Sequence, residues 1–245
     1  MRRTTSPATV VLWLSLLGAL LGGCGSASEP TGPTGVDELV IPTPSPAPSD
    51  FVEVIDNRWL AWEPGATATY QRVGTGVAGT PSPLEDTTVT TRVGNRTVVV
   101  AGLAATTLTT TTPEGVSTDW FAQDSRSNVW WLGRAGEWRA GLDGAQAGLF
   151  MPADPRVGDG YRAAEADGVV DQRVEVVEVV EVPSTGTRTR TETETETGIL
   201  RLEVRSALAP GVVDQQTYVV GRGLTRTTRT TAAPGSSYVL ELAGF

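Results

Sequence analysis

The chain has 245 residues, of which 39% are apolar, and a formal net charge of −9. All 19 basic residues are arginine and histidine is absent. Since histidine is the commonest general base near neutral pH and the commonest metal ligand, a Ser-His-Asp triad, a Cys-His pair and a histidine-based zinc site are excluded. An acidic surface also repels nucleic acid. We therefore expect no metal, no cofactor and no nucleic-acid partner.

The N-terminus reads MRRTTSPATVVLWLSLLGALLGGC, in which residues 8–21 form an apolar run. About 14 apolar residues are too few to span a hydrocarbon core of roughly 30 Å, but they are typical of a signal peptide. Residues 21–24, Leu-Gly-Gly-Cys, resemble the bacterial lipobox, which implies cleavage before Cys24 and diacylation of its thiol. We predict a lipoprotein signal peptide over residues 1–23 and an exported protein, lipid-anchored on the outer face of the cytoplasmic membrane.

Two alternatives for the N-terminus are an ordinary secretory signal that leaves Cys24 as a free thiol, and an uncleaved anchor. Cys24 is the only cysteine, so no intramolecular disulfide can form. Residues 24–50 are rich in Pro, Ser, Thr and Gly, and such a segment cannot bury a core. This composition predicts an acylated cysteine followed by a disordered tether.

Residues 51–245 are predicted to form a single antiparallel β domain. Residues 87–93, the turn residues Gly94 and Asn95, and the Thr-rich residues 96–112 indicate a hairpin that leads into a long strand. Pro113 to Gly115 predicts a turn. Residues 119–133 read DWFAQDSRSNVWWLG and indicate a second hairpin.

Both strands of this second hairpin carry aromatic residues on both faces. Strand alternation places Trp120 opposite to Phe121, and Trp130 opposite to Trp131. A strand with water on one side alternates apolar and polar residues, so something must cover both faces. The Gly-rich residues 136–152 are a candidate lid. The four aromatic residues are either core or the lining of an apolar ligand cavity.

The break between these strands, Asp124 to Asn128, has the Asp and Asn of some calcium loops. Arg126 stands at the middle ligand position and would repel a cation. Asp and Asn also favour tight turns through their own side chains, so we interpret this break as a turn and predict no metal site.

The C-terminal half indicates further strands. Val-rich residues 173–182 favour a strand over a helix, and residues 162–168 are compatible with a short helical turn. Residues 187–197 alternate Thr with Arg or Glu, which predicts a solvated edge ribbon. Three more stretches of strand are expected towards the C-terminus, at residues 199–207, at residues 212–220 turning at 221–223 into 224–231, and at residues 237–245. Since strands recur without βαβ alternation, we predict an all-β fold with an antiparallel sheet, half-barrel or sandwich-like, and a Gly-rich lid.

Four pieces of the chain resemble a family of uncharacterised secreted bacterial lipoproteins. They are LAWEPGATATY, DWFAQDSRSNVWWLG, GEWRAGLDGAQAGLFMPADPRVGDGYR and LAPGVVDQQTYVVGRGL, in the family's order. Ser125, Arg126 and Ser127 depart from the family's usual Asp-Gly turn, and the Thr-Glu ribbon is unlike typical members. The resemblance implies an exported location and an all-β fold, and it implies no catalytic residue.

We therefore expect a non-enzymatic envelope lipoprotein that binds or scaffolds, with a lipid or an envelope protein as partner. An apolar-ligand carrier is one form of this hypothesis. A carboxylate hydrolase acting on cell-wall glycans is an alternative, and a purely structural or adhesive protein is another. The hydrolase would draw on the acidic residues around the Gly-rich segment, which are Asp143, Asp154, Asp159, Glu165 and Asp171.

Overall fold

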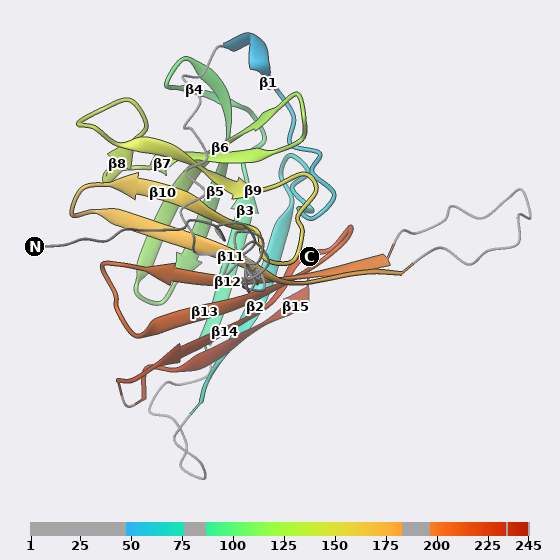
Figure 1. Cartoon of the computed structure of the whole chain (residues 1–245), viewed down its shortest axis with the longest axis vertical. Helices are drawn as coiled ribbons and strands as arrows, with labels where there is room; N and C mark the ends of the chain where they lie inside the picture. Colours follow the sequence, from blue (N-terminus) through green and yellow to red (C-terminus); the bar gives the residue numbers. More distant parts are fainter. Residues whose placement is uncertain (1–47, 76–86, 183–196, 234, 245) are drawn as a thin grey trace, which may run out of the picture. The chain divides into compact units, whose positions relative to one another are not determined.

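The computed structural model describes residues 48–75, 87–182, 197–233 and 235–244. This part of the chain begins with a 3-10 turn (Pro48–Asp50) and then forms antiparallel strands (Figure 1). The strands are β1 (Phe51–Val52), β2 (Thr67–Gly74), β3 (Thr87–Val93), β4 (Val98–Val100), β5 (Leu103–Thr112), β6 (Gly115–Asp124), β7 (Val129–Arg134), β8 (Trp138–Arg139), β9 (Gln146–Met151), β10 (Gly160–Ala166), β11 (Val170–Val182), β12 (Thr197–Ser206), β13 (Val212–Val219), β14 (Gly223–Thr231) and β15 (Tyr238–Gly244). The predicted all-β antiparallel class is confirmed.

Twelve of these strands close into a ring. The order runs β6-β5-β3-β2-β15-β14-β13-β12-β11-β10-β9-β7, and β7 pairs again with β6. The shorter β1, β4 and β8 attach to β6, β5 and β7. The sheet therefore goes beyond the predicted half-barrel, because the β6–β7 hairpin joins its two edges. Closure pairs the edge strands of the ring with each other.

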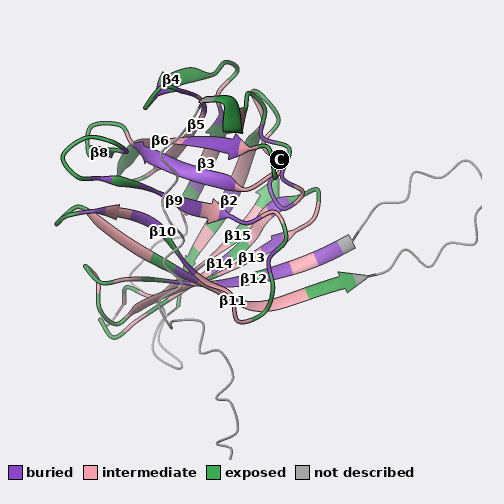
Figure 2. Cartoon of the chain, turned by 45° about the horizontal axis from the view of Figure 1, so that its top comes forward, coloured by how far each residue is buried: buried purple, intermediate pink, exposed green. Residues whose placement is uncertain are grey.

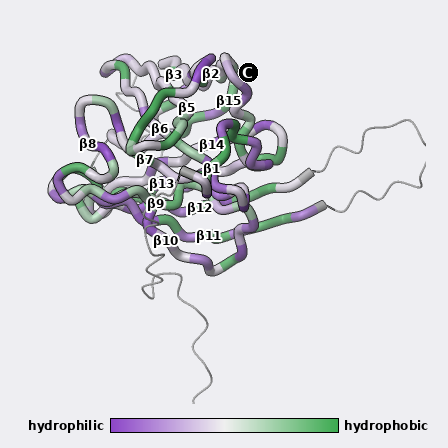
Figure 3. The backbone as a smooth tube through the Cα atoms, turned by 90° about the horizontal axis from the view of Figure 1, so that it is seen from above, coloured by the Kyte–Doolittle hydropathy of each residue, from purple (hydrophilic) through white to green (hydrophobic). Residues whose placement is uncertain are grey.

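Most strand predictions are confirmed. The turn at Pro113–Glu114 separates β5 from β6, and residues 173–182 lie within β11. Hydrophobic and hydrophilic residues alternate over residues 200–205 of β12, and β11 mixes both kinds along its length (Figure 3). The ribbon predicted at residues 187–197 lies outside the described residues except for Thr197, where β12 begins.

The short helical turn with which residues 162–168 were compatible does not form. Residues 160–166 form β10, which pairs with β11. The register of this pair shifts between Arg162 and Ala164, as a β-bulge does. Both Ala163 and Ala164 are consequently buried. The bulge breaks the two-residue period of a strand, which is why the sequence pattern resembled a helix there.

The inward face of the ring can be followed through cross-strand partners, because directly opposed residues share a face. It includes the buried residues Val174 and Val176 of β11 and Leu200, Leu202 and Val204 of β12. Register carries this face onward through β13, β14, β15, β2, β3, β5, β6 and β7. Members from these strands are Tyr218, Gln216, Asp214, Thr227, Arg229, Tyr238, Leu240, Leu242, Arg72, Tyr70, Val89, Leu108, Phe121 and Trp131.

The two ends of the ring differ. We call the end with the β6–β7 and β13–β14 turns the capped end, and the end with the β5–β6 turn the charged end. At the capped end lies a segment we call the N-terminal cap, residues 53–66. Its backbone N–H of Asn57 donates to Gln123 Oε1 at 2.9 Å, and its Arg58 carbonyl accepts from Gly221 at 3.2 Å.

The cap is held by buried polar and aromatic side chains. Asn57 Nδ2 donates to the carbonyls of Ser127, at 2.8 Å, and Pro152, at 3.2 Å. Trp59 is 0% exposed and packs over Gly198 of β12, where an added Cβ would lie 3.2 Å from the indole ring. The cap thus contacts strands from opposite parts of the sequence and fills this end of the ring.

Candidate functional site

The four aromatic residues singled out in the sequence are divided between two faces of the sheet. Phe121 lies directly opposite Trp131 on the inward face, with ring centroids 6.1 Å apart. Trp120 and Trp130 lie on the outward face, where Trp130 is buried and Trp120 is half-buried. The structure therefore does not bring the four together into one group.

The inward pair belongs to a larger aromatic cluster. Phe121 contacts Trp62 of the N-terminal cap at 4.9 Å and Phe150 of β9 at 4.7 Å between centroids. Trp131 meets Trp138 edge-on at 5.3 Å. Phe121 is 3% and Trp131 is 6% exposed. Protein side chains, without any ligand, account for the burial of this cluster.

The Gly-rich segment predicted as a lid is part of the sheet. Its residues form β8, a turn and β9, and β8 and β9 both pair with β7. Trp138 of β8 still covers Trp131, as a lid would. Gly148 allows β9 to approach β10 closely, since an added Cβ would lie 2.3 Å from the backbone of Ala163. Glycine serves tight strand packing here.

The segment Asp124 to Asn128 is the turn that the sequence indicated. Asp124 Oδ1 accepts from the backbone N–H groups of Arg126, at 2.9 Å, and Asn128, at 3.0 Å. Asp124 Oδ2 accepts from Trp130 Nε1 at 3.0 Å. The carboxylate therefore organises the turn and orients Trp130. Among the described residues, no group of three or more Asp, Glu or other ligand side chains could hold a metal ion.

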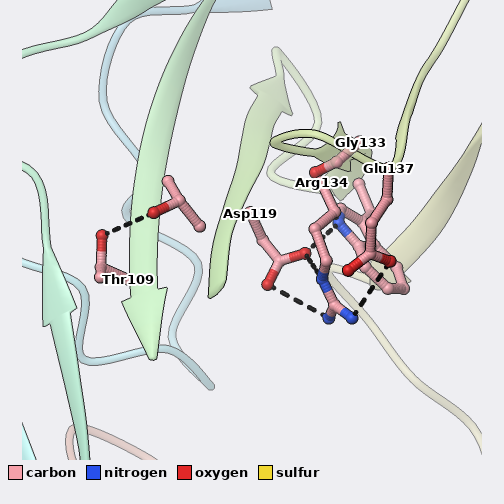
Figure 4. A network of polar contacts seen from close by, with 7 residues as sticks. Thr109, Asp119, Gly133, Arg134 and Glu137 are labelled. Carbon is pink, nitrogen blue, oxygen red and sulfur yellow. Dashed lines mark hydrogen bonds and ion pairs between the residues drawn. The ribbon is translucent and has the colours of Figure 1, made fainter. Parts of the chain in front are cut away.

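A buried carboxylate, Asp119, lies on the inward face of β6 (Figure 4). Its Oδ1 accepts from Trp131 Nε1 at 3.1 Å and from Arg134 Nε at 2.9 Å. Arg134 also approaches Glu137 at 3.8 Å. Burial raises the pKa of Asp119 above its ordinary value, and the hydrogen bond and charge of Arg134 oppose this effect. The network locks the indole of Trp131 in the aromatic cluster.

Towards the charged end, five adjacent strands carry a row of polar side chains on the inward face. We call it the arginine–tyrosine row, and it consists of Asp214 (β13), Arg229 (β14), Tyr238 (β15), Arg72 (β2) and Thr87 (β3). The Tyr238 ring lies between two guanidiniums, with centroid distances of 5.1 Å to Arg229 and 5.7 Å to Arg72. Guanidiniums so placed are attracted to the aromatic ring.

The two arginines of the row have different partners. Arg229 binds both carboxylate oxygens of Asp214, with Nε to Oδ1 at 2.7 Å. Asp214 lies directly opposite on the next strand, and its side chain is 14% exposed. Arg72 donates to Thr87 Oγ1 at 2.9 Å and to Glu114 Oε1 at 2.6 Å. Glu114 belongs to the β5–β6 turn and its side chain is 62% exposed.

The pKa directions follow these contacts. The hydrogen bond from Arg72 lowers the pKa of Glu114 to about 2. The hydrogen bond to Asp214 raises the pKa of Arg229. Burial raises the pKa of Tyr238, against the effect of the Arg229 charge. These shifts keep Glu114 ionised, Arg229 charged and Tyr238 neutral near neutral pH.

Water reaches the inward face unevenly. On β10, β11 and β12 most inward side chains are buried, including Tyr161, Val176 and Leu202, although Gln172 and Val179 of β11 are half-buried. On β13, β14, β15 and β2 most are only half-buried: Asp214, Gln216, Arg229, Tyr238, Leu240, Leu242 and Arg72. In Figure 2 buried residues are frequent on β10 and β12, whereas β13 and β15 are largely half-buried or exposed. Half-buried leucines and charged residues thus lie together on the concave side of these four strands.

Three tyrosines lie deeper on the inward face. Tyr70, Tyr161 and Tyr218 are all buried, and burial raises the pKa of each. The Tyr218 hydroxyl donates to Gln216 Oε1 at 3.0 Å. Among the described residues, the buried Tyr161 hydroxyl has no hydrogen-bond partner. An unpaired buried hydroxyl is costly, so the interior near Tyr161 would be stabilised by an added acceptor.

The acidic residues of the hydrolase alternative are distributed over several elements. Asp143 lies in the turn between β8 and β9, and Asp154 and Asp159 lie between β9 and β10. Glu165 and Asp171 are opposed across β10 and β11, where they pair with Arg162 and Arg173. These ion pairs and turn positions are ordinary roles for surface carboxylates.

The arginine–tyrosine row was missed by the sequence reasoning, because its members are far apart in the chain. One local signal was present. Asp214, Gln216 and Tyr218 are two residues apart in one strand and therefore share a face. Arg226 and Arg229 are three residues apart in the next strand, so they lie on opposite faces and one of them must face inward. Residues 1–23, Cys24 and the tether through residue 47 lie outside the described residues. The described residues contain no helix of sufficient length and hydropathy to cross a membrane.

No family model matches the chain, and no curated protein matches it. A crystal structure from Parabacteroides distasonis, described as a putative lipoprotein, is similar at 10% sequence identity and a TM-score of 0.26. The similarity covers 76% of this chain and 97% of that chain. A TM-score of this size supplies no argument about fold or function, and the resemblance to a lipoprotein family stays a prediction.

Proposed function

We propose that this chain is a membrane-anchored, extracytoplasmic lipoprotein that binds an apolar-bodied ligand without chemical conversion. The proposed anchor is diacylglyceryl-Cys24, on the outer face of the cytoplasmic membrane, and the proposed binding surface is the inward face of β13, β14, β15 and β2. Two acyl chains are sufficient for stable anchoring, whereas one is marginal.

The observation that carries the proposal is the uneven burial of the inward face. Leu240 and Leu242 are half-buried on a concave surface, whereas most inward side chains of the adjoining strands β12, β11 and β10 are buried. Water against apolar side chains is unfavourable, and an apolar ligand would displace it. The unpartnered Tyr161 hydroxyl adds a hydrogen-bond donor in the same interior.

Native mass spectrometry of the full chain, extracted from its own membranes, tests the binding function. We expect adducts whose masses correspond to a bound lipid-like molecule. A mass that matches only the acylated polypeptide, together with failure to take up added amphiphiles, would contradict the proposal. A recovered protein neighbour in place of a lipid would instead favour a scaffold.

The anchor needs a separate test. Cys24→Ala should move the protein out of the membrane fraction or leave its signal peptide attached, and should abolish labelling by a radioactive fatty acid. A full chain that retains Met1 in the cytosol would overturn the proposed location.

A further inference from the structure

We propose that the ligand is an anionic amphiphile, with a carboxylate or phosphate head that Arg72 binds in place of Glu114. This inference rests on the proposed function, because it names the class of apolar-bodied ligand. The Glu114 carboxylate, which accepts a hydrogen bond from Arg72, occupies the position that the head would take.

The two ion pairs of the arginine–tyrosine row differ in how easily they can be exchanged. Asp214 and Arg229 are directly opposed in the sheet and make two hydrogen bonds. Glu114 projects from a turn, with its side chain 62% exposed, and meets Arg72 through one nitrogen. Because the Glu114 carboxylate is open to water, its ion pair contributes little to stability. A competing anion could therefore displace Glu114 far more readily than Asp214.

Arg72 itself is suited to recognise an anion. Its side chain is only 12% exposed, and its Nε is held by Thr87 at 2.9 Å. A guanidinium fixed in this way loses little freedom on binding, and its planar fork matches a carboxylate or phosphate. One anion would replace another at Arg72, and the released Glu114 carboxylate would return to solvent.

The surroundings of Arg72 explain why the anion should carry an apolar chain. Leu240 lies directly opposite Arg72, and Leu242 lies directly opposite Tyr70 on the same face. Both leucines are half-buried. A head bound at Arg72 thus places its chain along the inward side of β15, beside the ring of Tyr238.

The test is a competition between two probes with the same chain, dodecanoate and 1-dodecanol. The full chain, purified from its membranes in detergent, is equilibrated with an equimolar mixture, and native mass spectrometry gives the ratio of bound carboxylate to bound alcohol. Partition of the probes into detergent is the same for every variant, so changes in the ratio report on the protein. Circular dichroism confirms that each variant is folded.

We expect wild type to prefer dodecanoate. Arg72→Gln should lower the bound ratio about tenfold or more, since a charge-assisted hydrogen bond is lost. Arg72→Lys should lower it less. Glu114→Gln should raise it about two- to fivefold, because the competing carboxylate is removed. The control is Arg226→Gln, which removes an exposed arginine that pairs with Glu241 on the outward face, and it should leave the ratio unchanged.

The outcomes separate this inference from the function on which it rests. Equal binding of both probes, or a ratio that Arg72→Gln and Glu114→Gln leave unchanged, would overturn the inference while a ligand-binding function stands. If neither probe binds to wild type, the proposed function fails as well. If Arg72→Gln does not fold, the inference is tested by the smaller decrease expected for Arg72→Lys and by the increase expected for Glu114→Gln.

Discussion

The two ends of the closed sheet differ in how deeply their polar and aromatic side chains are buried. At the capped end, Trp59 and Asn57 are buried and meet several strands at once. At the charged end, Arg72, Arg229 and Tyr238 are only half-buried. One partner of Arg72, Glu114, lies on an exposed turn. Substitution of a buried residue lowers the free energy of unfolding more than substitution of a half-buried one. We therefore expect substitutions at the capped end to affect stability most, and substitutions at the charged end to affect ligand binding most.

The largest expected effect comes from Trp59→Ala at the capped end. Removing a fully buried indole should lower the free energy of unfolding by about 3–5 kcal/mol. Urea denaturation followed by circular dichroism measures this loss. Trp120→Ala is the matched control, because Trp120 is half-buried on the outward face. Equal losses in the free energy of unfolding for the two variants would show that the cap contributes no more to stability than the outward face does.

Asn57→Ala should have the next largest effect. It removes hydrogen bonds to the carbonyls of Ser127 and Pro152 and leaves these buried groups without that donor. The expected loss in the free energy of unfolding is about 2–3 kcal/mol. A loss below about 1 kcal/mol in the same denaturation experiment would mean that water replaces the amide and that the cap is loosely held.

Asp119→Asn addresses a buried charge between the two ends. Because burial raises the pKa of Asp119 in the folded state, its ionised form is disfavoured by folding. This penalty is present above the folded pKa and is relieved as the pH falls through it. Wild type should therefore gain stability relative to Asp119→Asn when thermal unfolding is followed from pH 7 down to acid. A wild type that loses stability relative to Asp119→Asn as the pH falls would contradict this assignment.

Glu114→Gln should have the smallest effect on stability and a clear pH signature. Its folded pKa of about 2 is lower than the ordinary 4.5. The stabilising contribution of the Arg72 pair is thus present above about pH 4.5 and is lost as the pH falls towards 2. The small difference between wild type and variant should vanish over that interval. A large loss of stability at neutral pH would show that the charged end is structural and would weaken the competition proposed for Arg72.

Local patterns predicted much of the fold. The turn at Pro113–Glu114 and the strand character of residues 173–182 depend on backbone preferences of neighbouring residues, and both are confirmed. The helical turn expected at residues 162–168 was wrong because the bulge in β10 is selected by its pairing with β11. The aromatic residues on both faces of β6 and β7 correctly implied cover on both sides, but not that Trp62 and Phe150 would supply it on the inward face.

The sequence by itself determined the all-β class, the hairpin of β6 and β7 and the turn chemistry of Asp124, because these depend on residues a few positions apart. Only the tertiary structure decided that the sheet closes, that the N-terminal cap fills one end and that Arg72, Tyr238 and Arg229 form one row. The physical reason is pairing over long sequence distances. A strand's alternation specifies which residues share a face, whereas the identity of the neighbouring strand depends on the packing of the whole chain.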